Sequence, residues 1–278
     1  MSKKYNTLIS PEEFIQIYSR KDIVILDTRF YLDDLLRGRK EYIQSHVPGA
    51  VYLDITHDLS SPVVKGLTGR HPIPDPEVLA FTFRAAGINH SSQVIVYDQS
   101  NGAYASRAWW LLRWLGYEDV AVVDGGFAAW ITLKGPLDNQ WPLPSPGNFE
   151  SQLQLQMHVD LNDLEHSHQP LIDSREYRRF TGEYEPIDPV AGHIPGAVCI
   201  PYMENTDATG KWKTTSELKD RFRDINGSQD GMPVFYCGSG VTACHNILAY
   251  KIATGKDAKL YSGSWSEWIL YNKLPARA

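Results

Sequence analysis

Short apolar runs alternate with longer stretches of helical composition along this chain of 278 residues. The runs are rich in β-branched residues and occupy 23–26, 94–97, 120–123, 171–172, 234–236 and 259–261. Residues 10–13, Ser-Pro-Glu-Glu, combine a capping Ser, a Pro at the first helical position and a Glu at the third, which is typical of a helix start. Strands that alternate with helices predict an α/β fold, with parallel sheets covered by helices on both faces.

The motifs of the first half occur again, in the same order, in the second half. The corresponding pairs are 24–29 and 170–175, 46–51 and 193–198, 94–98 and 233–237, and 124–130 and 262–268. Self-similarity of this kind indicates a duplicated domain.

A segment that is poor in regular structure separates the two copies. Residues 135–147 hold four prolines and two glycines, which prevent a continuous helix or a central strand. We therefore predict a first domain at 1–136, a linker at 137–157 and a second domain at 158–278. The length suffices for two hydrophobic cores.

Charge and cysteine content limit the partners and the compartment. Lys and Arg number 27 against 33 Asp and Glu, a net charge of −6, so binding to nucleic acid or to an anionic membrane is disfavoured. Three cysteines form an odd, sparse set that argues against a disulfide framework. With no apolar run long enough to span a membrane or serve as a signal peptide, we expect a soluble cytoplasmic protein.

The two copies differ most where a strand gives way to a helix. The second copy has Cys237 at this point, and the first copy has Asp98. Cys237 ends an apolar strand, and a helix is predicted to begin near Thr242. Backbone N–H groups of such a loop, together with the helix N-terminus, stabilise an anion. They would lower the thiol pKa from about 8.5, so Cys237 is predicted to be a nucleophile in the thiolate form.

The remaining cysteines are assigned to the core, and no metal is expected. Cys199 lies in an apolar strand and Cys244 lies inside the predicted helix, where packing is the simpler interpretation. A zinc site would need four ligands at recognisable spacing, which Cys237, Cys244 and His245 do not provide.

Three chemistries suit a glycine-rich loop of this kind. Residues 238–243 match a dinucleotide fingerprint, but too little chain follows to build the sheet that accompanies it. A thiol phosphatase needs an arginine where this chain has Ala243, so phosphate-ester hydrolysis is a weak alternative. Sulfur transfer needs only a thiol of low pKa, N–H groups that hold a persulfide, and donors for the acid group of the substrate. Ser239 and Thr242 can donate hydroxyl hydrogen bonds toward the sulfur.

At the level of whole motifs the chain resembles the two-domain rhodanese family of sulfurtransferases. The resemblance rests on both His-x-Pro-Gly-Ala motifs, the Asp-Gly-Gly and Gly-Ser-Trp segments near the ends of the copies, and the loop 237–242, Cys-Gly-Ser-Gly-Val-Thr. That loop is similar to those of 3-mercaptopyruvate sulfurtransferases, whereas thiosulfate-preferring members typically carry basic residues after the cysteine. The resemblance implies a catalytically inactive first domain, with Asp98 at the cysteine position, and a catalytic second domain.

The resemblance also implies roles for residues outside the cysteine motif. Arg179 matches the family's substrate-binding arginine, and His71 matches a histidine proposed to form a relay with Ser239 and an aspartate. The usual position of that aspartate holds Thr56 in this chain, and its neighbours Asp54 and Asp58 are the candidates to substitute for it. A second arginine usual in the mercaptopyruvate enzymes is replaced by Ile187, which leaves the preferred donor open.

These observations give one functional hypothesis and two alternatives. Cys237, Ser239 and His71 would be catalytic, while Arg179 and the loop residues Gly238, Gly240, Val241 and Thr242 would bind the substrate. The sulfur would pass from 3-mercaptopyruvate or thiosulfate through a Cys237 persulfide to a thiol, thioredoxin or cyanide, without a cofactor. The alternatives are thiosulfate:cyanide transfer as the main activity, and a non-catalytic rhodanese-like binding module.

Overall fold

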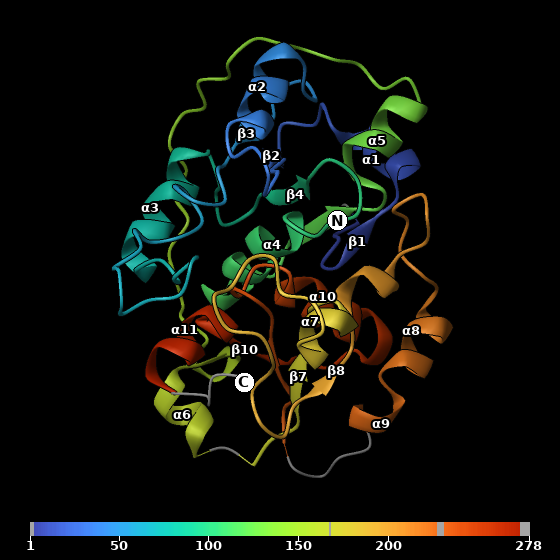
Figure 1. Cartoon of the computed structure of the whole chain (residues 1–278). Helices are drawn as coiled ribbons and strands as arrows, with labels where there is room; N and C mark the ends of the chain where they lie inside the picture. The colour runs from blue at the N-terminus through green and yellow to red at the C-terminus, as the bar shows by residue number, and fades with distance from the viewer. Residues whose placement is uncertain (1–2, 167, 227–230, 273–278) are drawn as a thin grey trace. The chain divides into compact units, whose positions relative to one another are not determined.

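The computed structural model describes residues 3–166, 168–226 and 231–272, which form two compact units (Figure 1). The first unit comprises the chain up to Ser60, Pro74–Gln154 and Thr206–Trp212. The second comprises Ser61–Ile73, Leu155–Asn205 and the chain from Lys213 onward. Ser61–Ile73 therefore packs with the second unit, although it lies in the first repeat of the sequence. The domain limits at 136 and 158, with the linker between them, stay predictions.

A parallel five-stranded sheet forms the centre of the first unit. Its strands, in the order β1-β5-β4-β2-β3, are β1 (Leu8–Ile9), β5 (Val120–Val123), β4 (Gln93–Tyr97), β2 (Ile23–Asp27) and β3 (Val51–Tyr52). The helices of this unit are α1 (Pro11–Ile17), α2 (Arg37–Gln44), α3 (Pro76–Ala85), α4 (Ala105–Trp114) and α5 (Gly126–Thr132). Helix α1 begins as predicted, because the Ser10 side chain accepts a hydrogen bond from the N–H of Glu13 and Pro11 occupies the first position.

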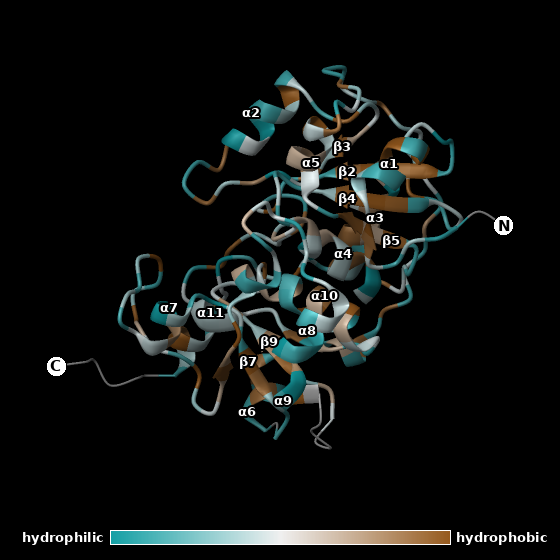
Figure 2. Ribbon diagram, turned by 90° about the vertical axis from the view of Figure 1, so that its right-hand side faces the viewer, coloured by the Kyte–Doolittle hydropathy of each residue, from teal (hydrophilic) through white to brown (hydrophobic). Residues whose placement is uncertain are grey.

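The two faces of this sheet pack against different helices. Ile95 and Val123 point to the face that holds Phe14 of α1 and Trp130 of α5. Because successive side chains of a strand point to opposite faces, Val94 and Val122 lie on the other face, and α4 contacts β4 and β5. Strands buried on both faces are mainly apolar, as the largely brown colouring of β4 and β5 shows in Figure 2.

The second unit repeats this arrangement. Its parallel sheet has the order β6-β10-β9-β7-β8, with β6 (His158–Val159), β10 (Lys259–Tyr261), β9 (Val234–Tyr236), β7 (Leu171–Asp173) and β8 (Val198–Cys199). The helices are α6 (Leu161–Glu165), α7 (Tyr177–Thr181), α8 (Thr215–Arg221), α9 (Arg223–Asn226), α10 (Ala243–Thr254) and α11 (Ser264–Tyr271), with 3-10 turns η1 (Leu155–Met157) and η2 (Tyr202–Asn205). The identical strand order confirms the duplication and the α/β class.

Core packing follows the same plan in the second unit. Leu164 of α6 and Trp265 of α11 pack on one face of the sheet with Val234, while α10 contacts β9 and β10. Buried ion pairs also correspond: Arg29 Nη2 lies 2.7 Å from Asp27 in the first unit, and Arg175 Nη2 lies 2.6 Å from Asp173 in the second. The motif repeats found in the sequence are thus repeats of structure.

The assignment of Cys199 to the core is wrong. Among the described residues its strand β8 lies at the edge of the sheet and pairs with β7 alone, so it is covered less than a central strand. Val198 is half exposed and Cys199 is partly exposed. Desolvation nevertheless raises the pKa of the Cys199 thiol to about 12, so this cysteine is a poor nucleophile.

Asp98 ends β4, at the position in the first unit that Cys237 occupies in the second. The residue is fully buried, and its carboxylate accepts hydrogen bonds from backbone N–H groups of the following loop. The donors are Ser100 and Gly102, both at 3.0 Å, Tyr104 at 2.9 Å and Ala105 at 3.3 Å. Burial raises the pKa of this carboxyl group against the effect of those donors.

Replacing Asp98 by alanine should destabilise the protein by about 3 kcal/mol, because buried N–H donors would lose their acceptor. Urea unfolding measures this change in the free energy of unfolding. Asp33→Ala, at an exposed position, is the control and should change the free energy by less than about 0.5 kcal/mol. Equal stability of the two variants would show that the loop does not depend on the carboxylate.

Candidate active site

Cys237 follows β9, and its side chain lies in the loop that leads into α10. Its sulfur accepts a hydrogen bond from the N–H of Gly240 at 3.2 Å. Burial alone would raise the pKa of the thiol. Hydrogen bonds from the Thr242 hydroxyl and from the N–H groups of Ser239, Ala243 and Gly240 outweigh burial and hold the pKa below its ordinary value. The Cys237 thiolate is therefore easier to form than that of an ordinary cysteine, although the residue is only 2% exposed.

The backbone of the loop explains the glycine at position 240. Gly240 has a φ of 76°, in the left-handed region that side chains disfavour. A β-carbon there would lie 2.4 Å from the carbonyl oxygen of Ser262. Val241 is buried beside it, and Cys244 donates its S–H to the carbonyl of Gly240 at 3.3 Å. Cys244 is fully buried, which confirms its assignment to the core.

Ser264 supports Cys237 from the start of α11. The Ser264 hydroxyl accepts the N–H of Cys237 at 3.1 Å and donates to the carbonyl of Tyr261 at 3.0 Å. Its φ is 56°, which costs a non-glycine residue about 1 kcal/mol. The first repeat has Gly126 at this position, with a φ of 55°. Ser264 was not predicted from the sequence, although a serine in one repeat and a glycine at the equivalent position of the other is a detectable signal.

His71 and Ser239 meet within the second unit. His71 belongs to the segment Ser61–Ile73, and its Nδ1 lies 2.8 Å from the hydroxyl of Ser239. Both residues are 8% exposed, so the pair is shielded but touches the surface. The predicted contact between a histidine of the first repeat and the cysteine loop is therefore present in the structure.

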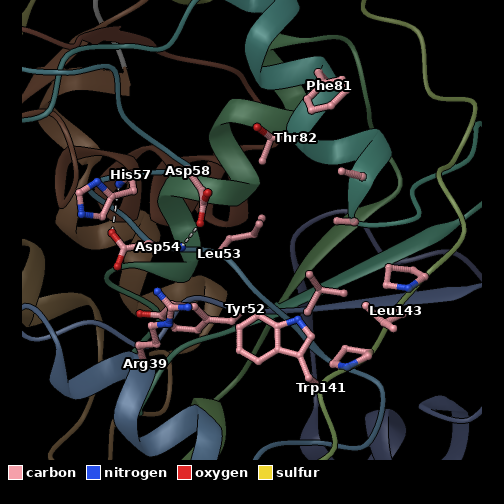
Figure 3. Close-up of a pocket in the computed structure, with 15 residues that line it drawn as sticks. Arg39, Tyr52, Leu53, Asp54, His57, Asp58, Phe81, Thr82, Trp141 and Leu143 are labelled. Carbon is pink, nitrogen blue, oxygen red and sulfur yellow. Dashed lines mark hydrogen bonds between the residues drawn. The ribbon is translucent and has the colours of Figure 1, made fainter.

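The two aspartates suggested for the relay make local hydrogen bonds in the first unit. Asp54 accepts the N–H of Thr56 at 2.7 Å, and Asp58 accepts the N–H of Asp54 at 2.7 Å. Both line a pocket of about 650 Å³ in that unit, and the rings of Phe81 and Trp141 line other parts of the same pocket (Figure 3). These contacts give the aspartates a role in shaping a turn.

Two guanidinium groups lie against Gly238. A β-carbon on Gly238 would be 2.6 Å from Nη2 of Arg70 and 3.5 Å from Nη2 of Arg179. Arg179 pairs with Glu185 at 2.8 Å and with Asp188 at 3.0 Å. Arg70 forms an ion pair with the other oxygen of Asp188. Arg179 was predicted from the sequence, whereas Arg70 and Asp188 were not, because their proximity depends on where Ser61–Ile73 packs.

Ile187 occupies the position at which the resemblance implied a second arginine. Ile187 is 38% exposed, and its N–H donates to Glu185 at 3.0 Å. The N–H of Asp188 donates to the same oxygen at 3.0 Å, which fixes the turn. Arg178 has a side chain 55% exposed and pairs with Glu183, as expected of a surface residue.

Two kinds of site are absent from the described residues. Within 3–166, 168–226 and 231–272, no three His, Cys, Asp or Glu residues are grouped so that they could hold a metal ion. Over the same residues, no helix has the length and apolar character needed to cross a membrane.

Known proteins resemble this chain over nearly its full length. The model of the rhodanese-like domain matches residues 10–133 and 157–270. A probable 3-mercaptopyruvate sulfurtransferase of Pseudomonas aeruginosa is 44% identical over 96% of each chain. A putative thiosulfate sulfurtransferase of Mycobacterium tuberculosis is 36% identical over 96% of this chain and 95% of that protein.

Solved structures agree with this assignment. The 3-mercaptopyruvate sulfurtransferase from Leishmania major has a TM-score of 0.85 and 29% identity, over 95% of this chain and 74% of that one. SseA from Escherichia coli, described with the rhodanese fold, has a TM-score of 0.81 and 34% identity over 95% of this chain and all of that one. The chain belongs to the rhodanese family, as its motifs indicated, and is an enzyme of the sulfurtransferase class.

Proposed function

We propose that Cys237 carries a sulfur atom, as a persulfide, from 3-mercaptopyruvate or thiosulfate to a thiol, thioredoxin or cyanide acceptor. The observation that carries the proposal is the set of hydrogen-bond donors around the buried Cys237 sulfur, among them the N–H of Gly240 at 3.2 Å, which lower the pKa of the thiol. The relatives named for 3-mercaptopyruvate and for thiosulfate support the choice of donors.

The first half-reaction with 3-mercaptopyruvate is a displacement at sulfur. The Cys237 thiolate attacks the donor's sulfur, an S–S bond forms, and the C–S bond breaks with its electron pair on carbon. The carbanion equivalent is the enolate of pyruvate, which takes up the proton of the donor's S–H group. The products are the Cys237 persulfide anion and pyruvate. The N–H groups around the sulfur stabilise the charge before and after this step.

Thiosulfate reacts by the same displacement with another leaving group. The thiolate attacks the outer sulfur, and sulfite leaves with the electron pair of the S–S bond. In the second half-reaction an acceptor such as cyanide attacks the outer sulfur of the persulfide and restores the thiolate. Charge and electrons balance in each step without a cofactor, and the persulfide makes the kinetics ping-pong.

His71 and Ser239 are proposed to manage the proton and the developing oxyanion. The 2.8 Å contact allows the imidazole to polarise the Ser239 hydroxyl. That hydroxyl can then donate toward the enolate oxygen as pyruvate leaves. Arg179 is proposed to bind the carboxylate of the donor, while Gly238, Gly240, Val241 and Thr242 form the wall around the sulfur.

The first domain is proposed to be inactive. Asp98 offers no nucleophilic sulfur, and its carboxylate accepts hydrogen bonds from the N–H groups of its loop. The second domain, 158–278, is therefore the proposed catalytic one. The cysteines are all free thiols, which supports the cytoplasm as the proposed location. Thiosulfate:cyanide transfer as the main activity stays an alternative, because Ile187 replaces an expected arginine.

Cys237→Ser should lower turnover with either donor by about 10³-fold or more, because a hydroxyl cannot replace the thiolate. Production of pyruvate or sulfite measures this loss. Cys199→Ser is the matched control and should retain activity, since the pKa of Cys199 is raised to about 12. Turnover that survives in Cys237→Ser would remove Cys237 from the mechanism.

Thr242→Val should move the pH profile toward higher pH. The Thr242 hydroxyl stabilises the thiolate, so its loss raises the pKa of Cys237. Activity rises with pH as the thiol ionises and levels off above its pKa, and the rising limb must shift upward with that pKa. Rates of single-turnover persulfide formation between about pH 5 and 9 test this. An unshifted limb would contradict a role of Thr242 in lowering the pKa.

His71→Asn should reduce kcat with 3-mercaptopyruvate by about 10²-fold and leave thiosulfate much less affected. The reason is that the pyruvate enolate must be stabilised and protonated, whereas sulfite leaves as a stable anion. Steady-state kinetics with both donors measure the difference. Equal losses with the two donors would assign His71 a purely structural role.

A further inference from the structure

We propose that Arg70 is the second cation that binds the anionic group of the sulfur donor, and that Asp188 sets the choice between singly and doubly negative donors. This inference deepens the proposed function and rests on it. Arg70 would contact the donor directly, beside Arg179, in place of an arginine at position 187.

Contacts within the second unit hold Arg70 in place. The segment Ser61–Ile73 packs there, and the N–H of Arg70 donates to the hydroxyl of Ser266 at 3.1 Å. From this anchor the guanidinium reaches Gly238, the residue next to the nucleophile. Arg70 also interacts electrostatically with the Cys237 sulfur, which counteracts the lowering of the Arg70 pKa by burial.

One hydrogen-bond donor of the Arg70 side chain is left without an acceptor among the described residues. Its Nη1 pairs with Asp188, whereas its Nε is buried and has no hydrogen-bond partner among the described residues. A buried donor without an acceptor costs about 1–3 kcal/mol. The side chain is still 31% exposed, so a small anion can approach it from solvent. An anionic donor group that accepts a hydrogen bond from the exposed part of this guanidinium would bring its sulfur toward Cys237.

The absence of a side chain at position 238 makes room for this guanidinium. A β-carbon there would lie 2.6 Å from Nη2 of Arg70, so the two cannot occupy their present positions together. A basic residue within the loop and an arginine from Ser61–Ile73 are therefore alternative ways of putting a cation beside the cysteine. The loop 237–242 contains no basic residue, and the structure provides the cation from another segment.

Asp188 limits the positive charge that the donor meets. Its carboxylate accepts from Arg179 at 3.0 Å through one oxygen and from Arg70 through the other, and its side chain is 2% exposed. Two cations thus share one buried anion. In Coulomb's law the energy of an anion near this cluster scales with its charge. Loss of the Asp188 charge must therefore favour a doubly negative donor more than a singly negative one.

Alkylation of Cys237 tests the anion site without any sulfur transfer. Iodoacetate carries a carboxylate and iodoacetamide is its neutral analogue, so the ratio of their rates at Cys237 reports the local cation. Arg70→Met should lower this ratio about 10-fold. Arg178→Met, which removes an exposed arginine, should leave it unchanged. Rates are followed by mass spectrometry of the peptide that contains Cys237.

Turnover gives the second readout. Arg70→Met should lower kcat/KM for both donors by about 30-fold or more, mainly through KM. Asp188→Asn should raise the ratio of kcat/KM for thiosulfate to that for 3-mercaptopyruvate by about 10-fold. Gly238→Ala keeps every charge but displaces the guanidinium of Arg70, so it should also lower the ratio of the iodoacetate rate to the iodoacetamide rate. This variant tests the proposal if Arg70→Met does not fold.

The outcomes separate this inference from the proposed function. If Arg70→Met slows both alkylating reagents equally, Arg70 acts only on the thiol, and the inference is overturned. An unchanged ratio in both Arg70→Met and Gly238→Ala overturns it as well. If the alkylation ratio falls as expected but the unmodified protein transfers no sulfur from either donor, the anion site stands and the proposed function fails.

Discussion

Stabilisation of one negative charge at the carboxyl end of a central strand is the interaction on which the site depends. In the second unit, N–H groups of the loop and of the first turn of α10 converge on the Cys237 sulfur. In the first unit, four N–H groups converge on the carboxylate of Asp98. The two units therefore have equivalent sets of N–H groups around the side chain that follows the strand, and we call each set an anion cradle. The proposed Cys237 persulfide carries one negative charge, as the thiolate does, so the same N–H groups would stabilise it.

The backbone geometry that the cradle requires explains the residue types in this part of the sequence. The loop must fold tightly enough to aim its N–H groups inward, which places Gly240 at positive φ and against the backbone of Ser262. Ser264 adopts a left-handed conformation that the first unit gives to Gly126. The hydroxyl gained in exchange accepts the N–H of Cys237. Strain of this kind persists where the surrounding structure holds it in place, which is common at functional sites.

Local patterns predicted much of the fold and of the site. The β-branched runs became strands with nearly the same limits, the capping residues at Ser10 started α1, and the loop after Cys237 led into a helix at Ala243. These features depend on neighbours in sequence, which is why they can be seen there. Comparing the two repeats added Asp98 as the counterpart of Cys237.

Features that depend on the order of strands in the sheet, or on which segments pack together, could not be predicted from the sequence. Hydrophobicity alone does not distinguish an edge strand from a central one, so Cys199 was misplaced in the core. Nothing in the composition of Ser61–Ile73 says that it packs with the second unit, so Arg70 was overlooked although its neighbour His71 was predicted. The bridging position of Asp188 follows from that packing and was missed for the same reason.

The mass of Cys237 after exposure to a sulfur donor tests the central claim most directly. The protein is incubated with 3-mercaptopyruvate or thiosulfate, freed of donor without reductant, and digested. The peptide that contains Cys237 should gain one sulfur, about 32 Da, and lose it on addition of cyanide. An unmodified Cys237 peptide with both donors, from protein whose Cys237 still reacts with iodoacetamide, would contradict the claim that the cradle holds a persulfide.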